Sequence, residues 1–178
     1  MDVSDNDMAL AAAGGDATAF STLLSRHYDR IFGFCFKLTG RRADAEDLTQ
    51  DICAALPAKI KHFEGRAQFT TWLYRVIVNA AHDQRSKRAT YSKVTQNWGS
   101  WELGRQAEMT ETASQIDWLN EAMSQLPNDL RDTLALVLDD VSHKAAGEVL
   151  GVSEGTISWR MSQVKQHLKS IKEQEDEA

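Results

Sequence analysis

The amino-acid sequence predicts an all-α fold, with two small helical domains joined by a flexible linker. The chain of 178 residues is 42% apolar and holds only two prolines, and Ala, Leu, Glu, Lys and Gln favour helices over strands. Apolar residues recur at helical spacing before residue 89 and again after residue 115. Residues 89–115 lose this spacing and are rich in Ser, Thr, Gly and Gln, so we expect them to link two domains.

The first half is expected to begin with a long amphipathic helix. Asp16 is placed to cap its start, because a short acidic side chain accepts hydrogen bonds from the unpaired N–H groups of a helix N-terminus. Thr39 and Gly40 are expected to end it, since glycine readily adopts the left-handed conformation common at helix ends. Three more helices are expected at residues 43–56, where Pro57 stops the helix, at 59–63 and at 69–88.

The second half contains the pattern of a helix-turn-helix. Helices at residues 116–125 and 128–139 are expected to precede it. A short helix at residues 142–149 is followed by a turn at Gly151 and by a longer helix that Ser153 caps. Gly147 supplies the small side chain that lets two helices cross closely. An ordinary helical hairpin could share this layout, so the pattern favours DNA binding and leaves a purely structural role open.

Charge is unevenly distributed along this acidic chain, whose net charge is −6. Residues 59–93 carry eight Lys or Arg against two acids, and residues 154–172 carry four cations against one acid. Basic clusters of this kind are typical of nucleic-acid-binding surfaces. The two basic islands therefore indicate DNA contacts that the net charge alone would argue against.

Several function classes have no support in the sequence. The longest apolar runs, such as 134–138, are far shorter than the ~20 residues of a membrane span, and the acidic N-terminus differs from a signal peptide. We therefore expect a cytoplasmic protein without membrane insertion. Cys35 and Cys53 lie in apolar helical patterns and are interpreted as reduced core residues. No nucleophile, metal-ligand or phosphate-loop pattern is present, so we expect no enzymatic activity, no metal site and no cofactor.

Three motifs in order carry a family resemblance. They are "DAEDLTQD" at residues 44–51, "FTTWLYRVIVNAAHDQRSKR" at 69–88, and "LPNDLRDTLAL" at 126–136 followed by the helix-turn-helix. Over nearly its whole length, the chain resembles the extracytoplasmic-function (ECF) class of bacterial sigma factors. The resemblance implies a subunit that binds core RNA polymerase and directs promoter-specific transcription initiation. It implies promoter DNA and an anti-sigma protein as further partners.

The resemblance also divides the chain into segments. These are an N-terminal tail (1–15), a sigma-2-like domain (16–92), a linker (93–115), a sigma-4-like domain (116–172) and an acidic tail (173–178). The sigma-2-like domain is expected to bind polymerase and to recognise and melt the minus-10 element. The sigma-4-like domain is expected to recognise the minus-35 element. We expect the free chain to be extended, and a single anti-sigma protein to compact it by covering both basic islands.

Acidic and amide side chains on one helix are the candidate polymerase-binding residues. They are Asp44, Glu46, Asp47, Gln50 and Asp51. Spread over adjacent helical turns, they form an acidic surface that could pair with basic residues on the polymerase. A merely solvated helix face remains the alternative, whereas metal ligation lacks a histidine or further acid to complete a site.

The minus-10 candidates combine an aromatic residue, a polar reader and cations. They are Phe63, Arg75, Asn79, Arg85, Lys87 and Arg88. Melted DNA is held by aromatic surfaces that stack on unpaired bases and by cations that bind the strand backbone. By resemblance, Phe63 and Asn79 lie near the pocket for a flipped base. Each nearby aromatic residue on its own is more typical of core than of a stacking surface, and Trp72 is the first that we expect to be buried. Trp72 and Leu73 are assigned to packing.

The minus-35 candidates lie on the second helix of the helix-turn-helix. They are Ser153, Thr156, Ser158, Trp159, Arg160, Gln163 and Lys165. They leave Ile157, Met161 and Val164 as a buried stripe at helical spacing. This helix is less basic than the family pattern, and Trp159 is unexpected on its outer face. Trp98 and Trp101 of the linker are expected to pack between the domains or against polymerase.

Two other functions are compatible with parts of the pattern. A sigma-like decoy or adaptor would bind an anti-sigma protein without reading DNA, but it would not need the cations of residues 75–88. A stand-alone helix-turn-helix repressor would not need the acidic helix at residues 44–51.

Overall fold

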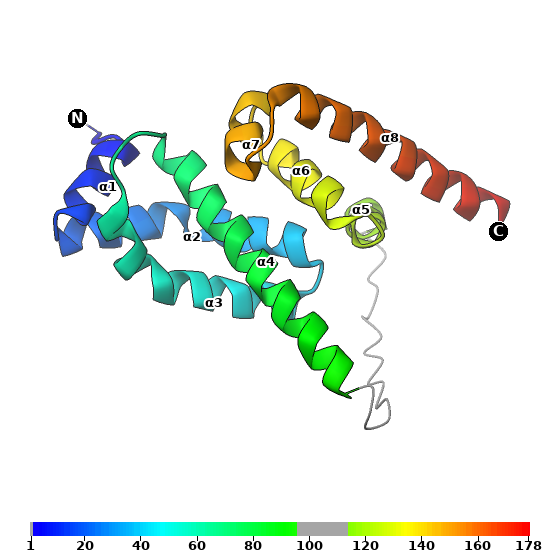
Figure 1. Cartoon of the computed structure of the whole chain (residues 1–178), viewed down its shortest axis with the longest axis horizontal. Helices are drawn as coiled ribbons and strands as arrows, with labels where there is room; N and C mark the ends of the chain where they lie inside the picture. Colours follow the sequence, from blue (N-terminus) through cyan, green and yellow to red (C-terminus); the bar gives the residue numbers. More distant parts are fainter. Residues whose placement is uncertain (1, 96–113) are drawn as a thin grey trace.

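The computed structural model describes residues 2–95 and 114–178, and this part of the chain contains helices and no strand (Figure 1). The N-terminal unit comprises α1 (Asp5–Ala13), α2 (Ala17–Thr39), α3 (Arg42–Lys59), the short 3₁₀ helix η1 (Ile60–His62) and α4 (Phe69–Thr95). The C-terminal unit comprises α5 (Ser114–Ser124), α6 (Asn128–Leu138), α7 (His143–Leu150) and α8 (Glu154–Glu177). The predicted all-α fold is confirmed.

Local capping signals define the ends of α2, as predicted. The carboxylate of Asp16 accepts a hydrogen bond from the backbone N–H of Ala19 at 3.0 Å. Gly40 ends the helix in the left-handed conformation, with φ of 73°. The sequence places the cap and the glycine 24 positions apart, which sets the length of α2.

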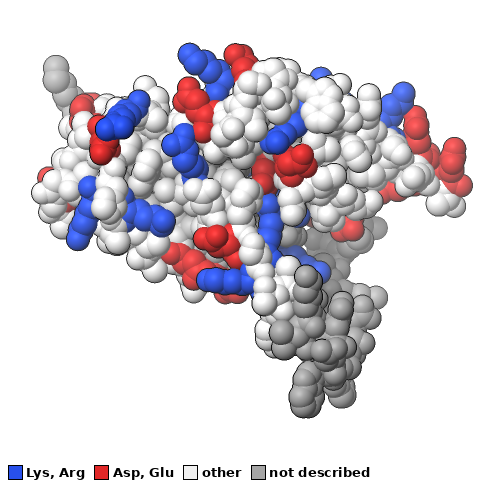
Figure 2. Space-filling view, viewed as in Figure 1, with Lys and Arg blue, Asp and Glu red and all other residues white. Residues whose placement is uncertain are grey.

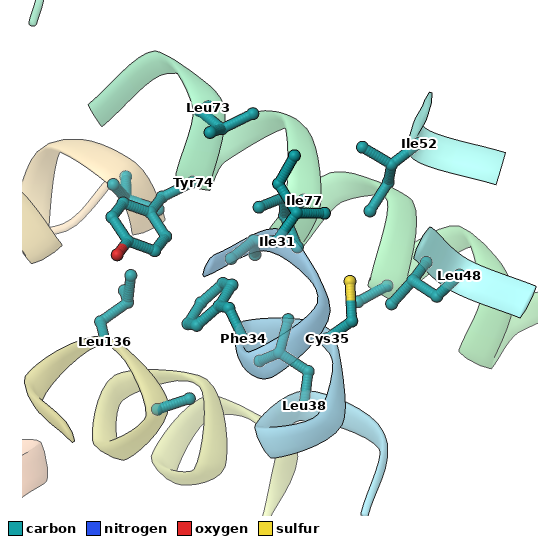
Figure 3. Packing of buried hydrophobic residues seen from close by; sticks show 14 of the residues in the cluster. Ile31, Phe34, Cys35, Leu38, Leu48, Ile52, Leu73, Tyr74, Ile77 and Leu136 are labelled. Carbon is teal, nitrogen blue, oxygen red and sulfur yellow. The ribbon is translucent and has the colours of Figure 1, made fainter. Parts of the chain in front are cut away.

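A single hydrophobic core runs through both units. In the N-terminal unit it joins α2, α3 and α4, for example through Ile31, Ile52 and Ile77 (Figure 3). Leu136 of α6 belongs to the same core. It lies near Tyr74 of α4 and Phe34 of α2 (Figure 3). Because residues of both units belong to this one cluster, the two units share apolar packing. Full burial of such side chains stabilises a fold by ~1.5–3 kcal/mol each.

The predicted N-terminal tail is wrong for residues 5–13, which form α1. The side chain of Ser4 caps this helix by accepting from the N–H of Asp7 at 3.1 Å. Met8, Ala9 and Ala12 are buried against the neighbouring helices. Alanine gives almost no amphipathic contrast, so the pattern did not indicate a packed helix.

Five helix boundaries also differ from the prediction. Pro57 does not stop α3, which continues to Lys59; the proline removes one backbone hydrogen bond, and the helix runs only two residues beyond it. η1 replaces the short helix expected at 59–63. No Gly or Pro interrupts residues 89–95, and α4 continues through them. α5 begins at Ser114, and α8 includes most of the expected acidic tail because Glu and Gln favour helices.

The two units pack against each other rather than lying apart. α4 contacts α7, and α2 contacts α6 and α5. We call this the closed arrangement, and it differs from the extended free chain that we expected. Most of the predicted linker, including Trp98 and Trp101, lies outside the described residues.

Candidate polymerase and nucleic-acid interface

One face of α3 exposes a group of acidic and amide side chains. Ala45, Leu48 and Ile52 are buried at helical spacing, so the residues between them face outward. The exposed candidates are Glu46, Asp47, Gln50 and Asp51. Glu46 pairs with Arg42 one turn earlier at 3.0 Å. The predicted acidic surface is therefore available for a basic partner at these four positions.

Asp44 has a different environment from the other four candidates. Both its carboxylate oxygens accept hydrogen bonds from Arg88 of α4, at 2.6 and 2.5 Å. Arg88 holds the pKa of Asp44 below its usual range, against the opposing effect of burial. Asp44 thus joins α3 to α4, and the same contact engages a cation that we predicted for DNA.

The aromatic residues before and within α4 are mainly core. The rings of Phe63, Phe69 and Trp72 pack at centroid distances of 5.6 to 6.0 Å. Phe63 is only 5% exposed, so its prediction as a DNA contact is not supported by its position. Phe63 and Phe69 are core, whereas Trp72, the aromatic residue that we most expected to be buried, is only half-buried. The cluster therefore packs the start of α4 onto the core, and Trp72 is the member that keeps part of its side chain exposed.

Two cations of α4 contact the C-terminal unit. Arg75 donates to the backbone carbonyl of Glu148 in α7 at 2.7 Å. Arg85 donates to both carboxylate oxygens of Asp132 in α6, at 2.8 and 3.1 Å, and to the carbonyl of Leu38 at 3.1 Å. Asn79 and Lys87 remain exposed. The closed arrangement therefore occupies Arg75 and Arg85 and leaves Asn79 and Lys87 accessible.

Acidic residues of α6 and of the turn after it hold the closed arrangement together. Asp132 is 2% exposed and also accepts a hydrogen bond from His82 of α4 at 2.8 Å. Asp139 forms an ion pair with Lys37 and accepts a hydrogen bond from Tyr74 at 3.0 Å. Burial, reinforced by the nearby Asp139, raises the pKa of Tyr74, which keeps its hydroxyl protonated as the donor.

Arg131 of α6 approaches the C-terminal end of α2. Its Nε donates to the carbonyl of Lys37 at 3.2 Å, while its Nη2 is buried without a partner among the described residues. Burial lowers its pKa, and Arg85 nearby acts in the same direction. The last carbonyls of a helix have no intrahelical partner and carry partial negative charge. Arg131 and Arg85 therefore satisfy neighbouring carbonyls at this helix end from two different elements.

The helix-turn-helix is formed by α7 and α8, as predicted. Ser142 caps α7, Gly151 ends it with φ of 70°, and Ser153 caps α8 by accepting from the N–H of Thr156 at 3.1 Å. A Cβ at Gly147 would lie 2.6 Å from the carbonyl oxygen of Val152, so the close crossing requires glycine.

The outer face of α8 carries the minus-35 candidates in several environments. Trp159 is 60% exposed, and Ser158 and Lys165 are exposed. Thr156, Arg160 and Gln163 are half-buried, and Arg160 lies 4.0 Å from Asp129. The predicted stripe faces inward, with Ile157 and Val164 buried and Met161 half-buried.

An open groove separates α4 from the C-terminal unit on part of this junction. Its volume is about 460 Å³, and it is lined by Arg85, Ser86, Asn128, Leu150 and Arg160 among others. Arg85 was predicted to contact the minus-10 element and Arg160 the minus-35 element. On the face in view in Figure 2, basic and acidic side chains are interleaved rather than forming one continuous basic stripe.

Two groups of residues were missed in the sequence. Arg66 and Gln68 are exposed in the loop 64–68, in the region where Phe63 was expected to meet DNA. Asp132 and Asp139 hold α6 to the N-terminal unit. Their spacing of seven, which places both on one side of a helix, was a signal for this role.

Membrane and metal sites find no support in the described part of the chain. None of its helices is long and apolar enough to cross a membrane. It also contains no group of three or more His, Cys, Asp or Glu side chains arranged to hold a metal ion.

Two segments of the chain match known protein families, and the whole chain has known relatives. Residues 23–90 match the family Sigma-70 region 2, and residues 116–168 match Sigma-70, region 4. The chain is 24% identical to the ECF RNA polymerase sigma factor SigW of Bacillus subtilis, over 87% of this chain and 89% of that protein. It is 28% identical to the ECF RNA polymerase sigma factor SigM of Mycobacterium tuberculosis, over 94% and 84% of the two chains.

A solved structure shares the fold. It is the sigma factor RpoE in complex with the anti-sigma factor NepR from Bartonella quintana, with a TM-score of 0.73 and 22% identity. The superposition covers 86% of this chain and 96% of that one. Sigma factors are not a catalytic class of protein. With both regions matched in order, the chain belongs to the sigma-70 family, as an ECF-class RNA polymerase sigma factor that directs transcription initiation.

Proposed function

We propose that this sigma factor binds core RNA polymerase through the exposed acidic face of α3. The observation that carries this assignment is the outward position of Glu46, Asp47, Gln50 and Asp51 on a helix whose opposite face is core. Exposed acids of this kind steer and orient a basic partner more than they add raw affinity. Asp44 accepts a hydrogen bond from Arg88 of α4, and this contact fixes the position of α3. The sigma factor would act in the cytoplasm, together with polymerase.

Promoter DNA would contact the loop 64–68, α4 and α8. Gln68, Asn79 and Lys87 are exposed and available for the minus-10 strand, and Arg66 is exposed but would exchange its ion pair with Glu64 (2.7 Å) for a phosphate. Exposed and half-exposed residues of α8, including Ser158, would contact the minus-35 duplex. Side chains near the start of a recognition helix are those that reach base edges in the major groove.

The closed arrangement would have to open before the remaining minus-10 cations reach DNA. Arg75 and Arg85 contact the C-terminal unit, where a backbone carbonyl and the Asp132 carboxylate occupy their donors. A carboxylate presents two oxygens much as a DNA phosphate does, so Asp132 and a phosphate would compete for Arg85.

An anti-sigma protein is the partner that we assign to the groove between α4 and the C-terminal unit. The groove lies beside Arg85 and Arg160, so a bound segment there would cover one predicted contact to each promoter element. The solved sigma factor of similar fold is bound to an anti-sigma factor. Such a partner would hold the units in place rather than compact an extended chain.

Transcription reconstituted with core polymerase tests the polymerase assignment. The full chain is expected to produce new start sites, and Asp47→Lys with Asp51→Lys is expected to reduce its affinity for core at least tenfold. Asp117→Lys with Glu121→Lys is the matched control, because it changes the charge equally at two exposed positions of α5. Unchanged co-purification of the α3 variant with core would contradict the assignment. A chain that binds an anti-sigma protein but starts no transcription with core would instead be a decoy.

A further inference from the structure

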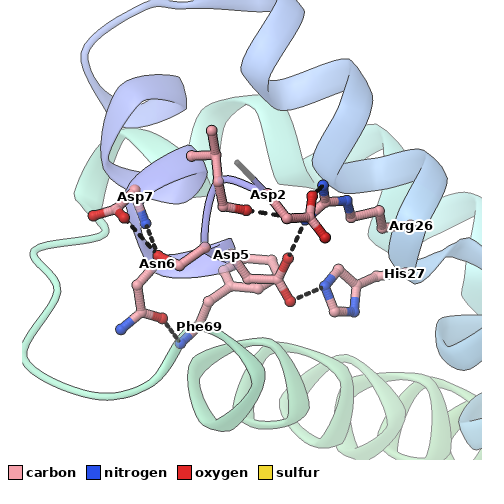
Figure 4. Close-up of polar contacts among 9 residues, drawn as sticks. Asp2, Asp5, Asn6, Asp7, Arg26, His27 and Phe69 are labelled. Carbon is pink, nitrogen blue, oxygen red and sulfur yellow. Dashed lines mark hydrogen bonds and ion pairs between the residues drawn. The ribbon is translucent and has the colours of Figure 1, made fainter.

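Helix α1 lies outside both matched family segments, which begin at residues 23 and 116. Figure 1 shows it at the end of the N-terminal unit where α4 begins, and Figure 4 shows its side chains reaching α2 and α4. We propose that α1 is a positioning element that fixes the loop 64–68 for capture of a melted promoter base. This inference rests on the proposed DNA contact of that loop.

Asn6 of α1 holds the start of α4. Its side-chain oxygen accepts a hydrogen bond from the backbone N–H of Phe69 at 2.7 Å (Figure 4). The first N–H groups of a helix have no partner within the helix, and a preceding Ser, Thr, Asp or Asn usually supplies one. Here the preceding residue is Gln68, which is not among these preferred caps. The cap comes instead from a residue 63 positions away in the sequence.

Leu10 of α1 contacts the other end of the loop. Gly65 has a φ of 72°, a conformation that favours glycine. A Cβ at this position would lie 3.4 Å from a methyl carbon of Leu10, so Leu10 packs directly over the turn. The turn therefore has a fixed apolar neighbour even though Leu10 itself is 45% exposed.

A third contact reaches Phe69 through α2. Asp5 accepts a hydrogen bond from Nε2 of His27 at 2.8 Å, and the His27 ring meets Phe69 edge-on at a centroid distance of 5.2 Å. Arg26 donates to Asp2 and to Asp5, which secures the start of α1 to α2 (Figure 4). Phe69 is thus held at its backbone by Asn6 and at its ring by His27.

These contacts fix both ends of a short exposed loop. Gly65 lies near its start and Phe69 follows its end, while Arg66 and Gln68 between them face solvent. A loop that is already ordered loses less conformational entropy when it binds a base, so preorganisation increases affinity. α1 therefore acts on base capture without touching DNA itself.

Variants of Asn6 in the full chain test this role. In Asn6→Ala, the Phe69 amide should exchange its hydrogen about tenfold faster, because loss of a cap of ~1.4 kcal/mol is a factor of ten. In Asn6→Asp, which keeps an acceptor oxygen, exchange should stay within about twofold of the parent. Unchanged exchange at Phe69 in Asn6→Ala would overturn the inference, whatever the loop does with DNA.

Base capture is measured with the chain bound to core polymerase. The probes are single-stranded minus-10 DNA and the same strand with one abasic site. Asn6→Ala and Leu10→Ala should each reduce the affinity difference between the probes about fivefold or more, with binding to core unchanged. Ser4→Ala is the control, because it removes the cap of α1 itself but no contact to the loop.

The control variant and the abasic probe separate positioning of the loop from a general effect on stability. An equal loss in Ser4→Ala would mean that α1 acts only through general stability, and it would overturn the inference. If the parent chain bound the two probes with equal affinity, the proposed DNA contact of the loop would be refuted, and with it the role of α1 in base capture. The exchange measurement at Phe69 would then still report whether α1 holds the loop.

Discussion

Some side chains in this protein have both a structural contact and a predicted DNA contact. Arg88 lies in the basic stretch that we predicted for DNA, yet it forms a bidentate contact with Asp44. The contact raises the pKa of Arg88 and lowers that of Asp44. Half of the Arg88 side chain is exposed, so solvent and salt weaken the pair. A DNA phosphate could therefore compete for Arg88 at moderate cost.

The depressed pKa of Asp44 predicts how its contribution to stability depends on pH. Because the folded-state pKa lies below the unfolded value of ~3.9, the contribution is complete above that value and is lost as the pH falls through the folded pKa. Asp44→Asn should therefore lower the free energy of unfolding by about 1 kcal/mol at pH 7, after allowance for the exposure of Arg88. Urea unfolding at about pH 7 and pH 3 checks this. A deficit that is equally large at both values would contradict the assignment.

Residue exposure could be predicted from the sequence where helical spacing determines it. Asp47 and Asp51 face outward because Leu48 and Ile52 occupy the buried positions of the same helix. Phe63 could not be placed in this way, since it follows a helix end and its burial depends on where the next loop leads. The partner of Asp44 was equally hidden, because Arg88 lies 44 positions away.

At the scale of the element, the helix-turn-helix depends on one close crossing. Alanine at position 147 would favour the helix by ~1 kcal/mol, but its Cβ would press against a backbone oxygen that cannot move alone. Sterics should decide, because overpacking typically costs about 1–3 kcal/mol.

Two glycine-to-alanine variants in this motif should have opposite effects. Gly147→Ala should destabilise the chain by about 1–3 kcal/mol and weaken minus-35 binding. Gly155→Ala should stabilise it by about 0.5–1 kcal/mol, because a Cβ there meets only the Ser153 hydroxyl at 3.8 Å and the helix gains a better former. Thermal unfolding of both variants provides the measurement. Stabilisation by Gly147→Ala would show that the crossing can relax.

Elements with strong local signals were predictable, and the others were not. Asp16, Gly40, Gly151 and Ser153 each act within their own turn, so the sequence around them is enough. α1 lacks amphipathic contrast, and its packing depends on residues of α2 that come later in the chain. The extension of α4 through residues 89–95 reflects helix propagation, because these residues contain no glycine or proline.

At the scale of the whole molecule, the closed arrangement was beyond sequence reasoning. Its polar contacts join residues 47 to 102 positions apart, whereas periodicity reports on neighbours within a few turns. Asp132 contributes most to these contacts, because its buried carboxylate accepts hydrogen bonds from both Arg85 and His82. Removing one partner of a buried ion pair typically costs about 3–5 kcal/mol.

Neutralising Asp132 should therefore open the molecule. Asp132→Asn is expected to increase the radius of gyration in solution scattering and to raise the affinity of the free chain for single-stranded DNA severalfold, since Arg85 is released. Glu121→Gln is the control with the same charge change at an exposed position. A compact Asp132→Asn chain would refute the role of this contact. An open chain without a gain in DNA affinity would instead remove Arg85 from the DNA surface.

The pairing of α2 and α4 with α6 has a consequence for the evolution of this chain. Lys37 with Asp139 and Arg85 with Asp132 join the two family regions by matched charges. A substitution at one of these positions would favour compensation at its counterpart, so the two regions would diverge as a pair. A chimaera that takes region 4 from a paralogue is expected to lose this match and, with it, the ion pairs of the closed arrangement. We therefore expect that region 2 and region 4 of this sigma factor are not interchangeable modules, even though each matches its own family.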